Sequence, residues 1–79
     1  MSVQQRSDWY GDQQQLSPAW TIHKGSKTAQ CAVWSHQFGW ELRLMSGTQL
    51  LQSQVVRSHE ELVEVCMGWR DAMVAKGWS

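Results

Sequence analysis

The sequence predicts an α+β domain in which a four-stranded antiparallel meander carries one C-terminal helix on one face (ββββα). Between residues 19 and 56, apolar and polar side chains alternate with period two, and breaks that contain glycine divide this stretch into four segments. From residue 58 onward, the apolar residues recur with the 3.6-residue period of an amphipathic helix. At 79 residues, the chain has room for a single small domain.

The first two strands are expected over 19–24 and 28–35, with a tight turn between them. The turn residues are Gly25 and Ser26, and glycine in the first place is typical of a two-residue type II′ hairpin turn. This turn fixes a register in which large apolar residues meet small ones on one face, with Trp20 opposite Cys31 and Ile22 opposite Ala29. The register and the hydrophobic pattern agree, which supports the hairpin.

The third and fourth strands are expected over 40–45 and 48–56. The apolar faces of the second and third strands coincide if the loop between them has an even length, which places Val33 opposite Leu42. A turn at residues 46–47 then places Leu51 opposite Leu42, and Leu50 opposite Arg43. In this register Leu51 faces the core, whereas Leu50, Gln52 and Gln54 point to the other face.

The helix is expected to begin after Ser58 and to end at Gly77. Ser58 and Glu61 have the spacing of a capping box, in which the serine caps the helix and the glutamate reaches back. Glycine is the residue that most often ends a helix. The face toward the sheet is predicted to contain Leu62, Val65, Cys66, Trp69, Ala72 and Met73.

Residues 1–17 are rich in glutamine and show no period. We expect them to form a flexible or loosely docked N-terminal arm, and the ββββα domain to occupy residues 18–79. No apolar run is long enough to span a bilayer, and the N-terminus lacks the pattern of a secretory signal. The expectation is therefore a soluble, cytoplasmic protein that has no contact with membranes.

The residues that carry chemistry in other proteins form no site in this pattern. Cys31 and Cys66 are expected to be inert, buried thiols on opposite layers, beyond the reach of a disulfide bond. The histidines and cysteines match no metal-ligand spacing, and no serine or carboxylate has a catalytic partner at a suitable spacing. We therefore expect no metal, no other cofactor and no enzyme activity.

The face of the sheet that the helix leaves open is the candidate binding surface. Trp40 shares its parity with the core residues, whereas Trp34 points to the open face. Tryptophan and arginine are the residues most enriched at binding hot spots. The predicted partner-binding residues are Trp34, Arg43, Met45, Leu50, His23 and Gln52. The alternative is that the N-terminal arm covers Trp34 through Trp9 or Tyr10, while Arg43 stacks on its ring.

A second alternative is a nucleic-acid-binding sheet. Lys24 and Lys27 flank the first turn and are candidates for phosphate contacts, with Trp34 stacking on a base. The stretch GWELRL is followed by two turns and by a helix with an acidic start. This part of the chain resembles the sheet and the start of the helix in the AP2-type DNA-binding domains of plants. That resemblance implies DNA reading by the sheet, but the strongly basic strands of that family are missing here. A formal charge of zero also disfavours this class.

The function expected from these observations is protein–protein interaction by a small non-catalytic module. Proteins of this size include regulators and phage-encoded inhibitors of larger complexes. The fourth strand has neither charge nor proline, so it is also expected to be an open edge that pairs with a partner or forms a homodimer. Finally, Val63, Met67 and Val74 lie beside the core face of the helix, where they either widen its contact with the sheet or form a second partner surface.

Overall fold

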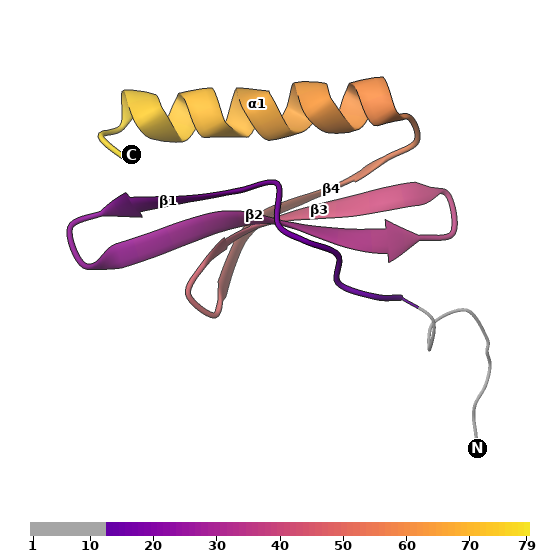
Figure 1. Ribbon diagram of the computed structural model, residues 1–79, viewed down its shortest axis with the longest axis horizontal. Coiled ribbons are helices and arrows are strands. Elements are labelled where there is room, and N and C mark those ends of the chain that lie inside the picture. The colour runs from indigo at the N-terminus through magenta and orange to yellow at the C-terminus, as the bar shows by residue number, and fades with distance from the viewer. Residues whose placement is uncertain (1–12) are drawn as a thin grey trace, which may run out of the picture.

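The computed structural model describes residues 13–79 as one antiparallel sheet with one helix across a single face (Figure 1). The strand order is β1-β2-β3-β4, a simple meander. The elements are β1 (Trp20–Lys24), β2 (Lys27–His36), β3 (Gly39–Ser46), β4 (Gln49–Val56) and α1 (His59–Ala75). The predicted ββββα fold is confirmed.

The first two hairpins have the predicted registers. Ile22 faces Ala29, and Val33 faces Leu42. Gly25 opens the first turn with a φ of 62°, a left-handed conformation that glycine adopts without a steric penalty. The alternation of apolar and polar residues sets both registers, because a slip by one residue would bring the apolar side chains to the open face.

The register of β4 differs from the prediction. Leu42 faces Gln54 rather than Leu51, and Arg43 faces Ser53 rather than Leu50. One cause is the turn: Ser46 pairs with Gln49, so the turn residues are 47 and 48 instead of 46 and 47. That change moves the register by two residues and preserves the faces.

The second cause is a bulge, which exchanges the two faces of most of β4. The register shifts between Leu44 and Met45, and Leu51 has no partner on β3. An extra residue in one strand inverts the alternation beyond it. Gln52 and Gln54 therefore lie on the helix side of the sheet, opposite apolar residues of β3, and the prediction that they point to the open face is wrong. Val56 is consequently fully buried.

The helix begins at the predicted cap. Ser58 Oγ accepts a hydrogen bond from the Glu61 backbone N–H at 3.1 Å. The Glu61 carboxylate reaches back as expected, but it accepts from the N–H of Arg57 at 2.9 Å, one residue before the cap. At the other end Lys76 is the C-cap, and Gly77 follows with a φ of 98°. The helix therefore ends where glycine permits the left-handed conformation.

The core lies between α1 and the covered face of the sheet. Leu42, Val56 and Cys31 are its largest fully buried side chains. Cys66 and Met73 enter from the helix, with Leu62, Val65 and Trp69 partly buried beside them, whereas Ala72 is exposed. Trp40 packs against this core, as its parity predicts. Trp20 also joins the layers, because its indole N–H donates to the Cys66 carbonyl at 2.8 Å.

The two cysteines meet in this core. Both are buried free thiols, as predicted, but their sulfur atoms lie only 3.6 Å apart. The expectation that the layer spacing separates them is therefore wrong, since each side chain points directly into the interface. Burial is the main cause that raises the pKa of Cys31 to about 12, and it also raises the pKa of Cys66. Neither thiol ionises at neutral pH.

The last residues of the predicted arm pair with the sheet. Leu16 N–H donates to the Val33 carbonyl at 2.7 Å, and the Gln14 carbonyl accepts from Ser35 N–H at 2.9 Å. This segment continues the β1 edge beyond the break around Pro18, so residues 13–16 are docked rather than flexible. Trp9 and Tyr10, the predicted cover of Trp34, lie outside the described residues. Among residues 13–79, no helix has the length and apolar character needed to cross a membrane.

Candidate binding surface on the open sheet face

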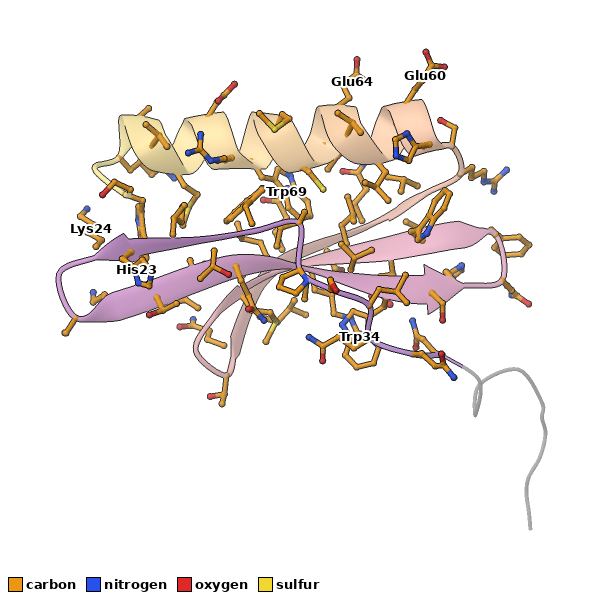
Figure 2. All side chains as sticks on the ribbon, viewed as in Figure 1. His23, Lys24, Trp34, Glu60, Glu64 and Trp69 are labelled. Carbon is orange, nitrogen blue, oxygen red and sulfur yellow. The ribbon has the colours of Figure 1, made fainter. Side chains whose placement is uncertain are left out.

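Trp34 lies on the face of the sheet that α1 does not cover. Figure 2 shows its side chain below the sheet, whereas Trp69 of the helix points at the opposite face. Across the strands, Trp34 is flanked by Gln15 on one side and by Glu41 on the other. Its side chain is only partly exposed. Strand parity thus correctly separates Trp34 from the core tryptophan Trp40.

Arg43 stacks on the Trp34 ring. The guanidinium carbon lies 4.3 Å from the ring centre, which is cation–π geometry. Arg43 faces Ala32 on β2, so it is the diagonal neighbour of Trp34, as follows from the predicted register that pairs Val33 with Leu42. The cation therefore lies over one face of the indole.

Glu41 fixes Arg43 in this position. Its Oε1 accepts hydrogen bonds from Arg43 Nη2 at 2.9 Å and from Gln13 Nε2 at 2.8 Å. The hydrogen bond from Arg43 is the largest influence on the pKa of Glu41, which it lowers, while burial acts in the opposite direction. The carboxylate is therefore ionised at neutral pH, and it anchors the guanidinium over the indole.

An open hollow adjoins this cluster. It lies on the uncovered face, beside the turn between β3 and β4, and one wall is the stacked Trp34–Arg43 pair. Its lining mixes amide, aromatic, apolar and cationic groups: Gln15, Gln30, Ala32, Trp34, Arg43, Met45, Gly47 and Thr48. We call these residues, together with Gln13 and Glu41, the Trp34 cluster. Such a mixture of an aromatic anchor and polar rim is typical of protein interfaces.

The structure brings together part of the predicted partner-binding set. Trp34, Arg43 and Met45 line the same hollow. Leu50 of β4, which is half exposed, faces Met45 of β3. His23 lies toward the far end of the sheet, opposite Thr28 and beyond the hollow. Gln52 lies on the helix side of the sheet, so its assignment to the open face is wrong.

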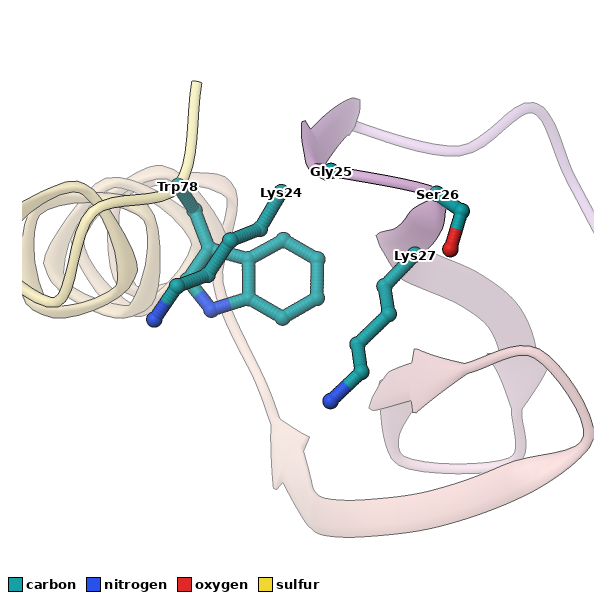
Figure 3. A pocket seen from close by; sticks show the side chains of 5 residues that line it. All are labelled: Lys24, Gly25, Ser26, Lys27 and Trp78. Carbon is teal, nitrogen blue, oxygen red and sulfur yellow. The ribbon is translucent and has the colours of Figure 1, made fainter.

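The two lysines predicted to contact phosphate lie at the first turn and away from Trp34. Lys24 and Lys27 line a shallow pocket together with Trp78 and the turn residues (Figure 3). The Lys24 ammonium donates to the Lys76 carbonyl at 2.7 Å. Trp34 lies seven residues after Lys27 on the same strand, β2. The lysines and the Trp34 ring therefore do not form the continuous surface that the nucleic-acid interpretation requires.

A second apolar strip follows the helix. Val63, Met67 and Val74 are 45%, 47% and 42% exposed. They do not extend the contact of α1 with the sheet, so the interpretation as wider coverage of the sheet is wrong. Within residues 13–79, no other element covers this strip.

Seven residues of the Trp34 cluster are not among the predicted partner-binding residues: Gln13, Gln15, Gln30, Ala32, Glu41, Gly47 and Thr48. Gln13 and Gln15 belong to a stretch without period, which gave no sign that they pair with the sheet. Glu41 pairs with Trp34, so the predicted register of the second and third strands puts it on the open face, although it is not among the predicted site residues. The spacing of Glu41 and Arg43, two apart on one strand face, was the available signal, because such side chains are neighbours.

Within residues 13–79, no three His, Cys, Asp or Glu residues gather in a way that suits a metal ion.

Comparisons of the chain with protein-family models, with curated protein sequences and with solved structures gave no match. The resemblance of the third strand onward to AP2-type domains thus has no support from a family match, and the sheet here has four strands rather than three. The interpretation of the open face rests on its geometry.

Proposed function

We propose that this protein is a small non-catalytic binding module that recognises a protein partner through its open sheet face. The observation that carries the proposal is the Trp34 cluster, in which Arg43 lies 4.3 Å above the indole and is held by Glu41. A preorganised aromatic–arginine pair loses little conformational entropy on binding. It also offers a partner both apolar area and hydrogen-bond donors.

The chemistry of the cluster favours recognition over catalysis. The only carboxylate in it, Glu41, already accepts hydrogen bonds from Arg43 and Gln13. Its lowered pKa makes it a weak general base at neutral pH. The adjoining hollow is open to solvent, whereas a reaction site usually encloses its substrate.

We further propose that the partner is a component of a larger complex, which this module regulates or inhibits in the cytoplasm, as small phage-encoded proteins do. The open edge strand β4 adjoins this face, and an edge strand accepts another strand through backbone hydrogen bonds. The two free, buried thiols agree with a reducing compartment.

The test is affinity capture from a lysate of the source organism with wild type, Arg43→Ala and Arg57→Ala as baits. Arg57 is the matched control, since its guanidinium lies 5.5 Å from the Phe38 ring centre, outside the Trp34 cluster. We expect a protein retained by wild type and Arg57→Ala, with or without nuclease, and lost with Arg43→Ala. Equal retention by all three baits would refute the role of the cluster.

The second candidate is nucleic-acid binding, and the pair Lys24 and Lys27 beside Trp78 is the observation that favours it. A phosphate-driven complex weakens steeply as the salt concentration rises. We expect random duplex DNA to bind no tighter than about 10⁻⁴ M at physiological salt, the weak end of non-specific binding. Submicromolar binding that disappears with added salt would make this candidate the leading one.

A further inference from the structure

The outer edge of β4 is open along its whole length within the part of the chain that the structure describes. β4 ends the strand order, at the edge of the sheet opposite β1. All its residues from Gln49 to Val55 are exposed. The opposite edge is partly occupied, because His23 of β1 exchanges two backbone hydrogen bonds with Ser79, at 3.1 and 2.8 Å. An edge strand with free backbone groups is a template for another strand.

β4 lacks two of the usual protections against such pairing, charged side chains and proline. Its sequence, QLLQSQVV, contains no charged residue and no proline. Beyond the bulge, Ser53 and Val55 face Arg43 and Glu41, so they lie on the open face. Leu51 is the unpaired residue of the bulge, and Leu51 and Val55 are 46% and 41% exposed. Two apolar residues thus flank a small polar one at an uncovered edge.

We propose that a second copy of this chain occupies this edge, with the two β4 strands antiparallel about a two-fold axis at Ser53. In this register, Leu51 faces Val55 of the second copy, and Gln52 faces its Gln54. Residues directly opposite one another share a sheet face, so the apolar pairs lie on the open face and the glutamine pairs on the helix side. The strand is therefore complementary to itself in both layers.

The dimer deepens the proposed function, on which it partly rests, by naming the occupant of the edge. It forms one eight-stranded sheet with both helices on the same side and both Trp34 clusters on the other. Partner recognition then has two equivalent sites on one continuous face. A single added ladder buries less area than a standard interface, so we expect a dissociation constant on the order of 10⁻⁶ to 10⁻⁴ M.

Sedimentation of the full chain at about 100 μM, near the weak end of that range, tests this inference with two matched double variants. In Gln52→Lys/Gln54→Lys, like charges face each other twice across the two-fold axis, so we expect association at least about tenfold weaker than in wild type. In Gln52→Lys/Gln54→Glu, opposite charges face each other twice, so the dimer persists at twice the 9.1 kDa chain mass. A register centred on residue 52 or 54 would instead oppose like charges in this second variant and dissociate it.

The result that overturns the proposal is a wild type that stays monomeric at this concentration, or a Gln52→Lys/Gln54→Lys variant that dimerises as well as wild type. If the lysine variants fail to fold by circular dichroism, amide exchange along residues 51–55 of wild type decides instead. Exchange that slows as protein concentration rises supports the dimer, and fast exchange at all concentrations refutes it. Arg43→Ala serves as the control that separates the two proposals, because it removes partner capture and leaves the dimer intact.

Discussion

The guanidinium carbon of Arg43 lies 4.3 Å from the centre of the Trp34 ring, while Nη2 of the same side chain donates to Glu41 at 2.9 Å. Arg43 and Glu41, both on β3, thus determine the surroundings of the Trp34 indole on β2. Arg43 stacks on the ring, and Glu41 holds Arg43 in that position. This arrangement orders a large side chain on the face of the sheet that α1 leaves open. It is the feature of the molecule from which the functional proposal follows.

Trp34 and Trp40 are expected to respond differently to truncation. Trp40→Ala removes a side chain that packs against the buried core, and such changes cost about 3–5 kcal/mol. Trp34→Ala loses a cross-strand contact and a partly exposed cation–π pair, together about 1 kcal/mol. Thermal melting of both variants checks this difference. Equal losses in melting temperature would show that the two rings do not lie on opposite faces.

The lowered pKa of Glu41 predicts a specific loss of stability in acid. Because the folded-state pKa is below the unfolded one, the contribution is present above about pH 4.3, the ordinary value for glutamate. It is lost as the pH falls through the lowered folded-state value. Chemical unfolding of wild type and Glu41→Gln from pH 7 downward should show a gap of up to about 1 kcal/mol at neutral pH that closes in acid. A gap independent of pH would mean that the carboxylate charge contributes nothing.

The buried thiols are expected to be unreactive in the folded protein. The raised pKa of Cys31, about 12, leaves almost no thiolate for reaction at neutral pH. A colourimetric thiol reagent should therefore modify neither cysteine until denaturant is added, and should then titrate two thiols. Fast reaction without denaturant would contradict the burial of the pair. No titratable thiol after unfolding would show that the sulfur atoms, 3.6 Å apart, had formed a disulfide.

Removal of residues 1–16 is expected to weaken the domain without unfolding it. The deletion removes two backbone hydrogen bonds to β2, the hydrogen bond from the Gln14 N–H to Ser35 Oγ, and the one from Gln13 to Glu41. At about 1 kcal/mol for each net hydrogen bond, the loss is roughly 3–4 kcal/mol. Denaturant unfolding of this chain and of a chain without residues 1–12 provides the comparison, since the shorter deletion keeps these contacts. Equal stability of the two truncated chains would contradict the docking of 13–16.

The sequence predicts the first three strands and the helix because each is specified by a local rule. A glycine turn and strict alternation fix the β1–β2 register, and a serine–glutamate cap fixes the helix start. The register of β4 escapes the same reasoning, because Leu50 and Leu51 are adjacent, as are Val55 and Val56. Each parity therefore offers two apolar residues, and the bulge that chooses between them leaves no mark in the pattern.

The candidate site was predictable to the same extent. Strand parity places Trp34 on the open face and Arg43 diagonally beside it, as found. The contributions of Gln13 and Gln15 depend on tertiary docking of a stretch without periodicity, for which sequence patterns have no signal. Gln52 was misplaced by the same bulge that moved Val56 into the core.

Backbone and indole N–H chemical shifts, measured as the captured partner is added, test the proposed binding surface most directly. We expect the largest changes at the Trp34 indole N–H and at the amides of Arg43 and Met45, with little change at Val63 and Met67 on the exposed strip of α1. Changes confined to that strip, or to the Lys24–Lys27 turn and Trp78, would contradict the assignment of the open sheet face as the partner-binding surface.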